Sequence, residues 1–130
     1  MALVVEDVTA GRILHREPVR SLDTFTLAYV HSSEHVPVRG VFRIAADRTM
    51  RVTETAFGGF GPGLPALKAG DEWRIEDGMI VARAPDARMP ELVVRVAPIT
   101  RHTLTTPAGT VVDLSALMGG TGGAVRISVR

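Results

Sequence analysis

The feature that most limits the fold of this chain is a short-range alternation of apolar and polar residues, broken by glycine or proline about every ten residues. Valine, isoleucine and threonine are abundant, and these branched side chains suit a pleated sheet better than a helix. No segment keeps apolar residues at helical spacing for more than about one turn. The pattern predicts an all-β fold, which is an antiparallel β-sandwich or small barrel of about eight to ten short strands with at most one short helical turn.

The positions of the expected elements follow from the alternation and from the turn residues. Strands are clearest at 25–31, 38–44, 50–55 and 125–129, with further strands expected at 11–17, 73–76, 79–82, 91–97 and 109–114. Asp77 and Gly78 are expected to form a two-residue hairpin turn, because both tolerate the positive φ that this turn needs. Residues 114–118, directly before two glycines, are expected to form one helical turn.

Length, charge and composition narrow the class of protein. The chain has 130 residues, which predicts a single β-domain over residues 1–130. Its formal net charge is +1, so it lacks the basic excess typical of nucleic-acid-binding proteins. It has no cysteine, and no apolar run reaches the ~18 residues that a membrane helix needs. The first residues do not resemble a secretory signal, so we expect a cytoplasmic protein, or a cell-envelope protein if a leader has been removed.

The first clear strand ends in polar side chains. Tyr29 and His31 continue the face of Phe25 and Leu27, which predicts that His31 points inward. His31 also begins the run His-Ser-Ser-Glu-His, which matches the H-x-x-E-H motif of inverted zinc peptidases. That motif holds a metal ion only on a helix, whereas the preceding strand and Pro37 disfavour a helix here. We therefore do not expect a peptidase site.

Glu54 is the second candidate polar residue. It continues the face of Met50 and Val52, which predicts a buried carboxylate. A buried carboxylate is costly unless it is paired or hydrogen-bonded. The available partners are His31, Arg95 and His102. Such a cluster would be an acid–base pair or part of a metal site, or else a structural polar pair that fixes the register of the strands.

The most unusual segment is Phe-Gly-Gly-Phe-Gly-Pro-Gly-Leu-Pro at residues 57–65. Its glycine amides suit the binding of an anion or a carboxylate, while its two aromatic rings suit a structural corner that plugs the core. The segment lacks the Lys-Ser/Thr ending of a phosphate-binding loop and the dinucleotide fingerprint, and the chain has no G-x-S-x-G elbow. We therefore expect no cofactor.

Two motifs together carry a family resemblance. Residues 29–38 read Tyr-Val-His-Ser-Ser-Glu-His-Val-Pro-Val, and residues 54–65 read Glu-Thr-Ala-Phe-Gly-Gly-Phe-Gly-Pro-Gly-Leu-Pro. In order and spacing they resemble the paired signature of the family called domain of unknown function 1850, with departures at Ser33, Gly59 and Pro62. Members of that family tend to be encoded beside tripartite (TRAP) transporters of the TAXI class, and many carry a leader or a membrane anchor. The resemblance therefore implies an accessory role beside such a transporter.

These observations lead to two functional hypotheses. The first is a non-catalytic β-domain that binds transporter components or a small carboxylate ligand, with no nucleic-acid partner and no membrane span in this chain. Its candidate site comprises Tyr29, His31, Ser32, Glu34, Glu54, Phe57, Phe60, Gly61, Gly63, Arg95 and His102. The alternative is a metal-dependent enzyme that uses His31, Glu34 and His102 as ligands and Glu54 as the base. In a third interpretation the signature residues only hold the sheet together.

Overall fold

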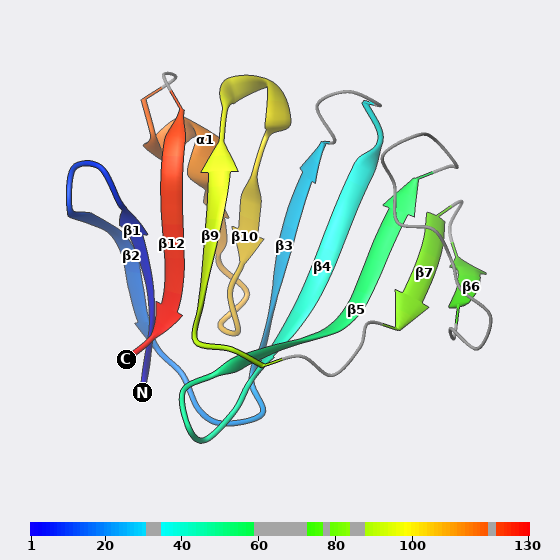
Figure 1. The fold of residues 1–130 in the computed structure, drawn as a ribbon, viewed down its shortest axis with the longest axis horizontal. Helices are drawn as coiled ribbons and strands as arrows, with labels where there is room; N and C mark the ends of the chain where they lie inside the picture. The colour runs from blue at the N-terminus through cyan, green and yellow to red at the C-terminus, as the bar shows by residue number, and fades with distance from the viewer. Residues whose placement is uncertain (31–34, 59–72, 77–78, 84–87, 120–121) are drawn as a thin grey trace.

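The protein folds into two antiparallel sheets (Figure 1), and the computed structural model describes residues 1–30, 35–58, 73–76, 79–83, 88–119 and 122–130. The four-stranded sheet has the order β2 (Arg12–Pro18), β1 (Ala2–Asp7), β12 (Gly123–Val129), β9 (Glu91–Val96). The eight-stranded sheet has the order β11 (Val111–Asp113), β10 (Thr103–Thr105), β3 (Thr24–Val30), β4 (Pro37–Ile44), β5 (Met50–Gly58), β7 (Met79–Arg83), β6 (Trp73–Glu76), with β8 (Arg88–Met89) paired to the start of β5. A 3-10 turn, η1 (Pro98–Thr100), and a short helix, α1 (Leu114–Leu117), complete the described elements.

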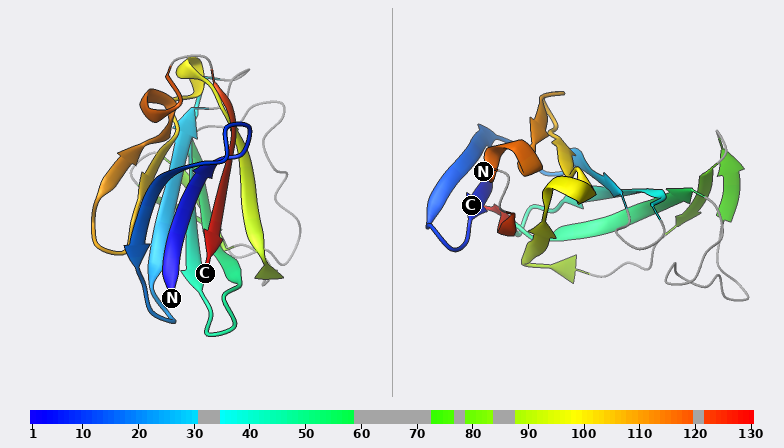
Figure 2. Two further views of the ribbon diagram at one scale, coloured as in Figure 1. Left: turned by 90° about the vertical axis from the view of Figure 1, so that its left-hand side faces the viewer. Right: turned by 90° about the horizontal axis from the view of Figure 1, so that it is seen from above.

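The four-stranded sheet packs on one half of the eight-stranded sheet, while β7 and β6 extend beyond it (Figures 1 and 2). The main core lies between the two sheets and includes Leu3, Phe25, Met50, Leu104 and Ile127. A second, smaller cluster consists of the buried residues Val38, Phe57 and Ile80, with Tyr29 packed against them. We call the two parts of the molecule the sandwich half and the extended half.

The all-β sandwich predicted from the sequence is confirmed. The helical turn is confirmed as α1, and β6 and β7 pair as expected with Glu76 opposite Met79, although the turn residues 77–78 lie outside the described residues. The described residues form twelve strands, and the additional ones are β1, β8 and β10. β8 and β10 have two and three residues, too few for alternation to be visible, and β1 does not alternate because Leu3, Val4 and Val5 are all buried.

β5 contains a β-bulge that exchanges the two faces of the strand. Neighbouring residues of β4 pair with Val52 and Glu54, so Thr53 is one extra residue in the ladder. Met50 and Val52 therefore pack in the main core, whereas Glu54 lies on the outer face of the sheet and Phe57 takes the inner face. The expectation that Glu54 continues the buried face of Met50 and Val52 is wrong for this reason.

The two ends of the chain lie side by side at the lower end of the sandwich half (Figure 1). The Ala2 amide donates to the Arg130 carbonyl at 2.7 Å, and the Arg130 amide donates to the Ala2 carbonyl at 2.8 Å. η1 and α1 lie at the opposite, upper end. Among the helices in the described part of the chain, none has the length and apolar character needed to cross a membrane.

Candidate functional site

His102 is buried at the upper end of the eight-stranded sheet, where it stacks on Tyr29. The two ring centroids are 4.8 Å apart and the ring planes differ by 12°. The register of β10 on β3 produces this contact. Thr103 of β10 pairs with Ala28 of β3, so His102, which precedes Thr103, lies opposite Tyr29, which follows Ala28. Two of the predicted site residues, far apart in the sequence, are thereby brought together.

The hydrogen bonds of Thr100 assign the tautomer of His102. Thr100 Oγ1 lies 2.8 Å from His102 Nδ1, 2.9 Å from the Ala97 carbonyl oxygen and 3.1 Å from the Ala97 amide nitrogen. A hydroxyl group has one proton, and all three contacts are satisfied only when that proton goes to the carbonyl and Nδ1–H donates to the hydroxyl. Nε2 is then an acceptor, and the hydrogen bonds of the described residues leave it without a donor.

Burial keeps the His102 ring neutral. Loss of hydration disfavours the imidazolium form and lowers the pKa of His102 below its ordinary value of 6.5. At neutral pH the ring is therefore an uncharged aromatic surface with one acceptor nitrogen. It can accept a hydrogen bond from a peptide amide or a hydroxyl, but it supplies no positive charge for an anion.

The backbone of His102 is held in place by the segment that follows β11. The His102 amide donates to Ser115 Oγ at 3.0 Å, and the Leu114 amide donates to the His102 carbonyl at 3.0 Å. Ser115 Oγ in turn donates to the Ala97 carbonyl at 3.0 Å, and Asp113 caps the start of α1. The ring position is thus fixed from η1, β10 and α1 together. Sequence reasoning missed Ser115, as it missed Thr100, because single hydroxyl residues carry no motif.

Tyr29 is the first member of an apolar row that crosses the extended half. The strand register pairs Tyr29 with Val38, then Phe57, then Ile80 and finally Ile75, and cross-strand partners share one face of the sheet. The three middle residues are buried, whereas Ile75 at the far end is 66% exposed. The inner face of this half is therefore continuous with the Tyr29–His102 stack.

Glu54 belongs to a different cluster on the outer face of the same sheet. Glu54 Oε2 lies 3.4 Å from Arg74 Nη2, and Arg74 Nε donates to Glu76 Oε2 at 2.7 Å. The side chains of Glu54 and Arg74 are 31% and 58% exposed. A partly solvated carboxylate paired with arginine is a surface ion pair. The sheet itself separates Glu54 from the Tyr29–His102 stack.

Arg95 and His35 also lie apart from the stack. Arg95 is exposed on the outer face of the four-stranded sheet, because its neighbours Val94 and Val96 face the main core. His35 is exposed with a left-handed backbone, at φ 54°, just before β4 begins at Pro37. The described end of the H-x-x-E-H motif is therefore not helical.

The remaining predicted residues are His31, Ser32, Glu34, Phe60, Gly61 and Gly63, and they lie outside the described residues. The proximity of His31 to Glu54 stays a prediction for that reason. Within the described ranges, no three histidine, aspartate or glutamate side chains form a group that could hold a metal ion.

A hollow of about 510 Å³ opens beside the backbone of His102. It is lined by Pro98, Arg101, Thr103, Asp113, Ser115 and Ala116. Ser115 is the link between this hollow and the stack, because its hydroxyl accepts from the His102 amide. A molecule in the hollow would contact η1 and α1 rather than the ring of His102.

Comparison with protein-family models matches residues 25–114 to the family described as Domain of unknown function (DUF1850). The chain belongs to the DUF1850 family. The DUF1850 region includes Tyr29, Glu54, Phe57 and His102 and every strand from β4 to β11, whereas β1, β2 and β12 lie outside it. The family match thus covers the eight-stranded sheet together with β9 of the four-stranded sheet. Comparisons with curated proteins and with solved structures found no match.

Proposed function

We propose that this DUF1850 protein is a non-catalytic binding domain, accessory to a TAXI-class TRAP transporter, that recognises a partner protein or a small carboxylate ligand at the upper end of its eight-stranded sheet. The observation that carries the proposal is the stack of the partly buried Tyr29 on the buried His102, whose Nε2 receives no hydrogen bond from the described residues. The transporter link comes from the family, whose members tend to be encoded beside such transporters.

Two observations favour binding over catalysis. The neutral His102 has its Nδ1 proton engaged by Thr100, and Glu54 is paired with Arg74 on the other face of the sheet. A general base and a metal ligand must reach the same reacting atom. A metal-dependent enzyme that combines His102 with Glu54 is not favoured by this arrangement.

The chemistry of the stack favours a partner protein over a carboxylate at this end. His102 Nε2 accepts a hydrogen bond, as a peptide amide or a hydroxyl would offer, and it has no charge to balance a carboxylate. The apolar row that begins at Tyr29 ends in the exposed Ile75. Aromatic and aliphatic anchors beside a few polar groups are typical of protein interfaces.

Purified substrate-binding subunit of the adjacent transporter, titrated into this protein by calorimetry, tests the proposal. A panel of small carboxylates forms the second arm. We expect the subunit to bind and the His102→Gln variant to bind it at least about tenfold more weakly, because the variant loses the ring. Arg95→Gln, which changes an exposed side chain of the other sheet, is the matched control and should bind as the wild type does.

Absence of binding in both arms, or equal affinity for a folded His102→Gln variant, would refute the proposal. Elemental analysis of protein purified without an affinity tag separates the enzyme hypothesis. Stoichiometric bound zinc would favour the metal-dependent enzyme over the binding domain.

A further inference from the structure

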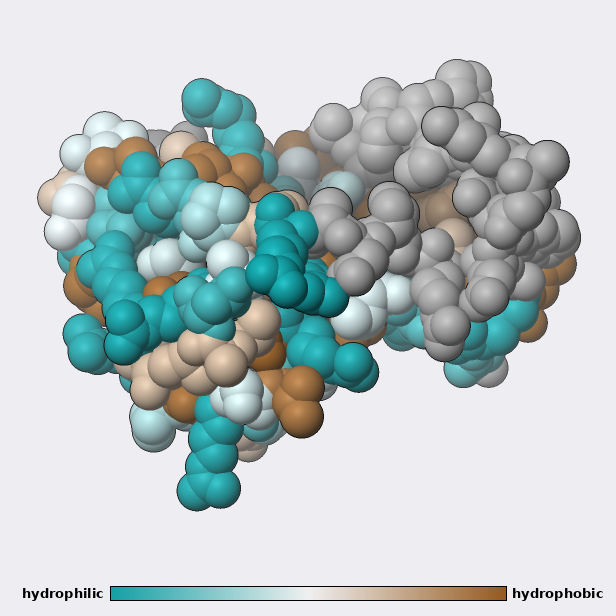
Figure 3. Space-filling model, turned by 60° about the horizontal axis from the view of Figure 1, so that its bottom comes forward, coloured by the Kyte–Doolittle hydropathy of each residue, from teal (hydrophilic) through white to brown (hydrophobic). Residues whose placement is uncertain are grey.

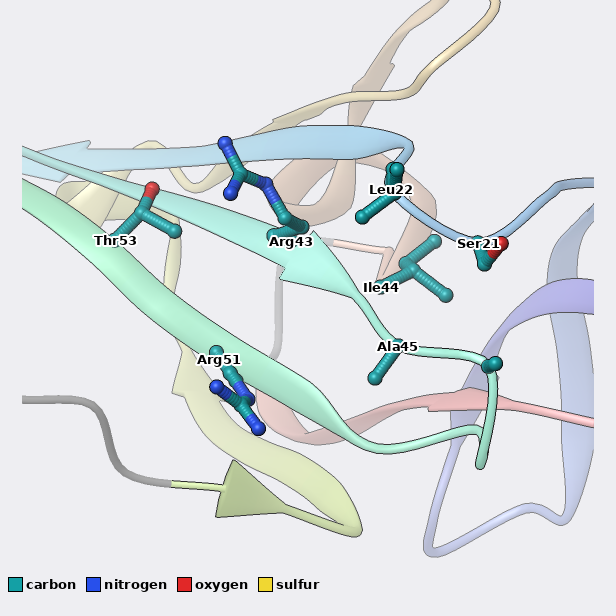
Figure 4. A pocket seen from close by; sticks show the side chains of 8 residues that line it. Ser21, Leu22, Arg43, Ile44, Ala45, Arg51 and Thr53 are labelled. Atoms are coloured by element: carbon teal, nitrogen blue, oxygen red, sulfur yellow. The ribbon is translucent and has the colours of Figure 1, made fainter.

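A pocket at the lower end of the eight-stranded sheet takes no part in the proposed function. Its volume is about 470 Å³, a size typical of small-molecule sites. The turn before β3, the end of β4 and the start of β5 form its walls (Figure 4). The lining residues are Ser21, Leu22, Arg43, Ile44, Ala45, Ala46, Arg51 and Thr53. Viewed from this end, the described surface is largely hydrophilic, with hydrophobic side chains in separate patches (Figure 3).

Positive charge gathers along one wall of the pocket. Arg43 pairs with Arg51 across β4 and β5, and Arg51 pairs with Arg88 across β5 and β8. Like charges directly opposite each other on neighbouring strands destabilise a sheet. Arg88 is balanced by Asp47, with Nη1 and Oδ2 at 3.2 Å, and Arg51 has an interaction of its own. No acidic side chain in the described ranges pairs with Arg43, which is exposed and turns its guanidinium away from that of Arg51 (Figure 4).

The other wall is apolar, and its backbone is strained. Leu22 has φ 74°, a left-handed conformation that leucine rarely adopts. The Leu22 amide donates to the Ile44 carbonyl at 2.8 Å and the Ile44 amide donates to the Asp23 carbonyl at 2.8 Å, which fastens the turn to the end of β4. The Leu22 side chain is left 74% exposed at the pocket. Strained backbone that is maintained by the surrounding structure clusters at active sites, ligand clamps and switch regions.

We propose that this pocket binds a small organic carboxylate with a short hydrocarbon chain. Arg43 pairs with the carboxylate, Ser21 offers a hydroxyl donor, and Leu22 and Ala45 contact the chain. Binding a negative charge here also offsets the repulsion within the arginine row. One guanidinium that has no acidic partner among the described residues, beside an apolar wall, suits a carboxylate better than a phosphate, which takes more donors. The proposal goes beyond the binding of a partner at the upper end, because it uses the opposite end of β3 and β4.

Calorimetric titration with acetate, butanoate and octanoate tests this site. Octanamide and inorganic phosphate serve as ligand controls. We expect octanoate to bind most tightly, then butanoate, then acetate, with the amide and phosphate far weaker. Arg43→Gln should weaken octanoate binding by at least about tenfold. Leu22→Gly keeps a backbone compatible with the turn and should weaken octanoate more than acetate, because it removes only the apolar contact.

Substitutions at the two ends of the sheet distinguish this pocket from the proposed binding site at the upper end. His102→Gln and Arg95→Gln should bind octanoate as the wild type does, and Arg43→Gln should bind the transporter subunit unchanged. The inference is overturned if no carboxylate binds, if octanamide binds as tightly as octanoate, or if a folded Arg43→Gln variant keeps wild-type affinity. If His102→Gln abolishes carboxylate binding and Arg43→Gln does not, the carboxylate site is at the upper end, and only the present inference fails.

Discussion

The sandwich half and the extended half of the eight-stranded sheet bury very different amounts of apolar surface. In the sandwich half the second sheet supplies Leu3, Val125 and Ile127 to one large core, all of them fully buried. In the extended half of the described structure, Val38, Phe57 and Ile80 form a small buried cluster, and Ala56 and Val81 are buried on the opposite face of the sheet. Burial of apolar surface is the main favourable contribution to folding. Most of the stability therefore comes from the sandwich half, while Tyr29 and His102 mark its junction with the extended half.

The boundary between the two halves runs through β5. Its first residues, Met50 and Arg51, pair with β8, while Glu54 to Gly58 pair with β7, and the bulge at Thr53 lies between the two pairings. The same strand thus packs Met50 in the main core and Phe57 in the small cluster. Binding surfaces are commonly drawn from the less stable part of a protein. The comparison of the two halves can be tested by changing one at a time.

Insertion of one alanine between Glu54 and Thr55 should have the largest effect. Side chains alternate along a strand, so the extra residue would turn Phe57 to the outer face and move Ala56 to the inner face. The loss of buried Phe57 costs about 3–5 kcal/mol. We expect the free energy of unfolding, measured by urea denaturation, to fall by about this amount. Deletion of Thr53 is the control, because it removes the extra residue of the bulge and leaves Glu54 outward and Phe57 inward, so a similar loss there would contradict the explanation.

Truncation of a buried side chain should destabilise the whole protein when it lies in the sandwich half, but only the neighbouring strands when it lies in the extended half. Ile127→Ala should lower the free energy of global unfolding by about 2–5 kcal/mol. Phe57→Ala should instead speed amide hydrogen exchange in β5, β7 and β6 while β1 and β12 stay protected. Native-state hydrogen exchange measures both. Uniform loss of protection across all strands in Phe57→Ala would show that the two halves unfold as one unit.

The pH dependence of stability should test the burial of His102 at the junction between the two halves. Because burial lowers the pKa of His102, the unfolded chain takes up its proton first when the pH falls below about 6.5. Stability should then decrease as the pH falls, by at most about 1.4 kcal/mol per pH unit for this one group. In His102→Gln this part of the pH dependence should disappear. Chemical denaturation between pH 8 and about pH 5 measures the slope.

Glu17, in the sandwich half, is the matched control for the pH experiment. Burial alone raises the pKa of Glu17, but hydrogen bonds from His15, Thr106 and Ala108 outweigh burial, so the pKa lies below its ordinary value of 4.5. The stability that this carboxylate supplies is lost as the pH falls below 4.5. Glu17→Gln should therefore alter the slope below that pH. An unchanged slope near pH 6 in His102→Gln would contradict the assignment of a buried neutral ring.

Glu54→Gln should have the smallest effect. The carboxylate and Arg74 are both partly exposed, and such ion pairs contribute about 0–1 kcal/mol. Thermal unfolding should show little change, and binding of the transporter subunit should be retained. Arg74→Gln is the control and should behave in the same way. A large loss of binding in Glu54→Gln alone would place the recognition site on the outer face instead.

The sequence predicted the positions of the strands better than it predicted which face of the sheet each side chain occupies. Alternation correctly located β3, β4 and most of β5, because each has a buried and an exposed side. Alternation placed Glu54 on the wrong face because Thr53 is one extra residue in the strand, and no glycine or proline nearby indicates a bulge. A bulge of this kind depends on the register with β4, which local sequence does not contain.

The sequence identified residues of the candidate site, but it did not predict how they are arranged in space. Tyr29 and His102 were both expected to take part, yet their contact depends on pairing between β3 and the three-residue β10. A strand so short has no detectable periodicity. Thr100 and Ser115, which orient His102, could not be recognised because an isolated hydroxyl residue is common in any loop.

The backbone hydrogen bonds between Ala2 and Arg130 bring both ends of the chain to one lower corner. A linker, label or solid support joined to either end would hold the domain by its most stable part. The upper end of the eight-stranded sheet, where Tyr29 stacks on His102, would then face the solution and be accessible to a large partner. The same proximity makes the molecule suited to circular permutation, in which the ends are joined and the chain is opened at another exposed turn.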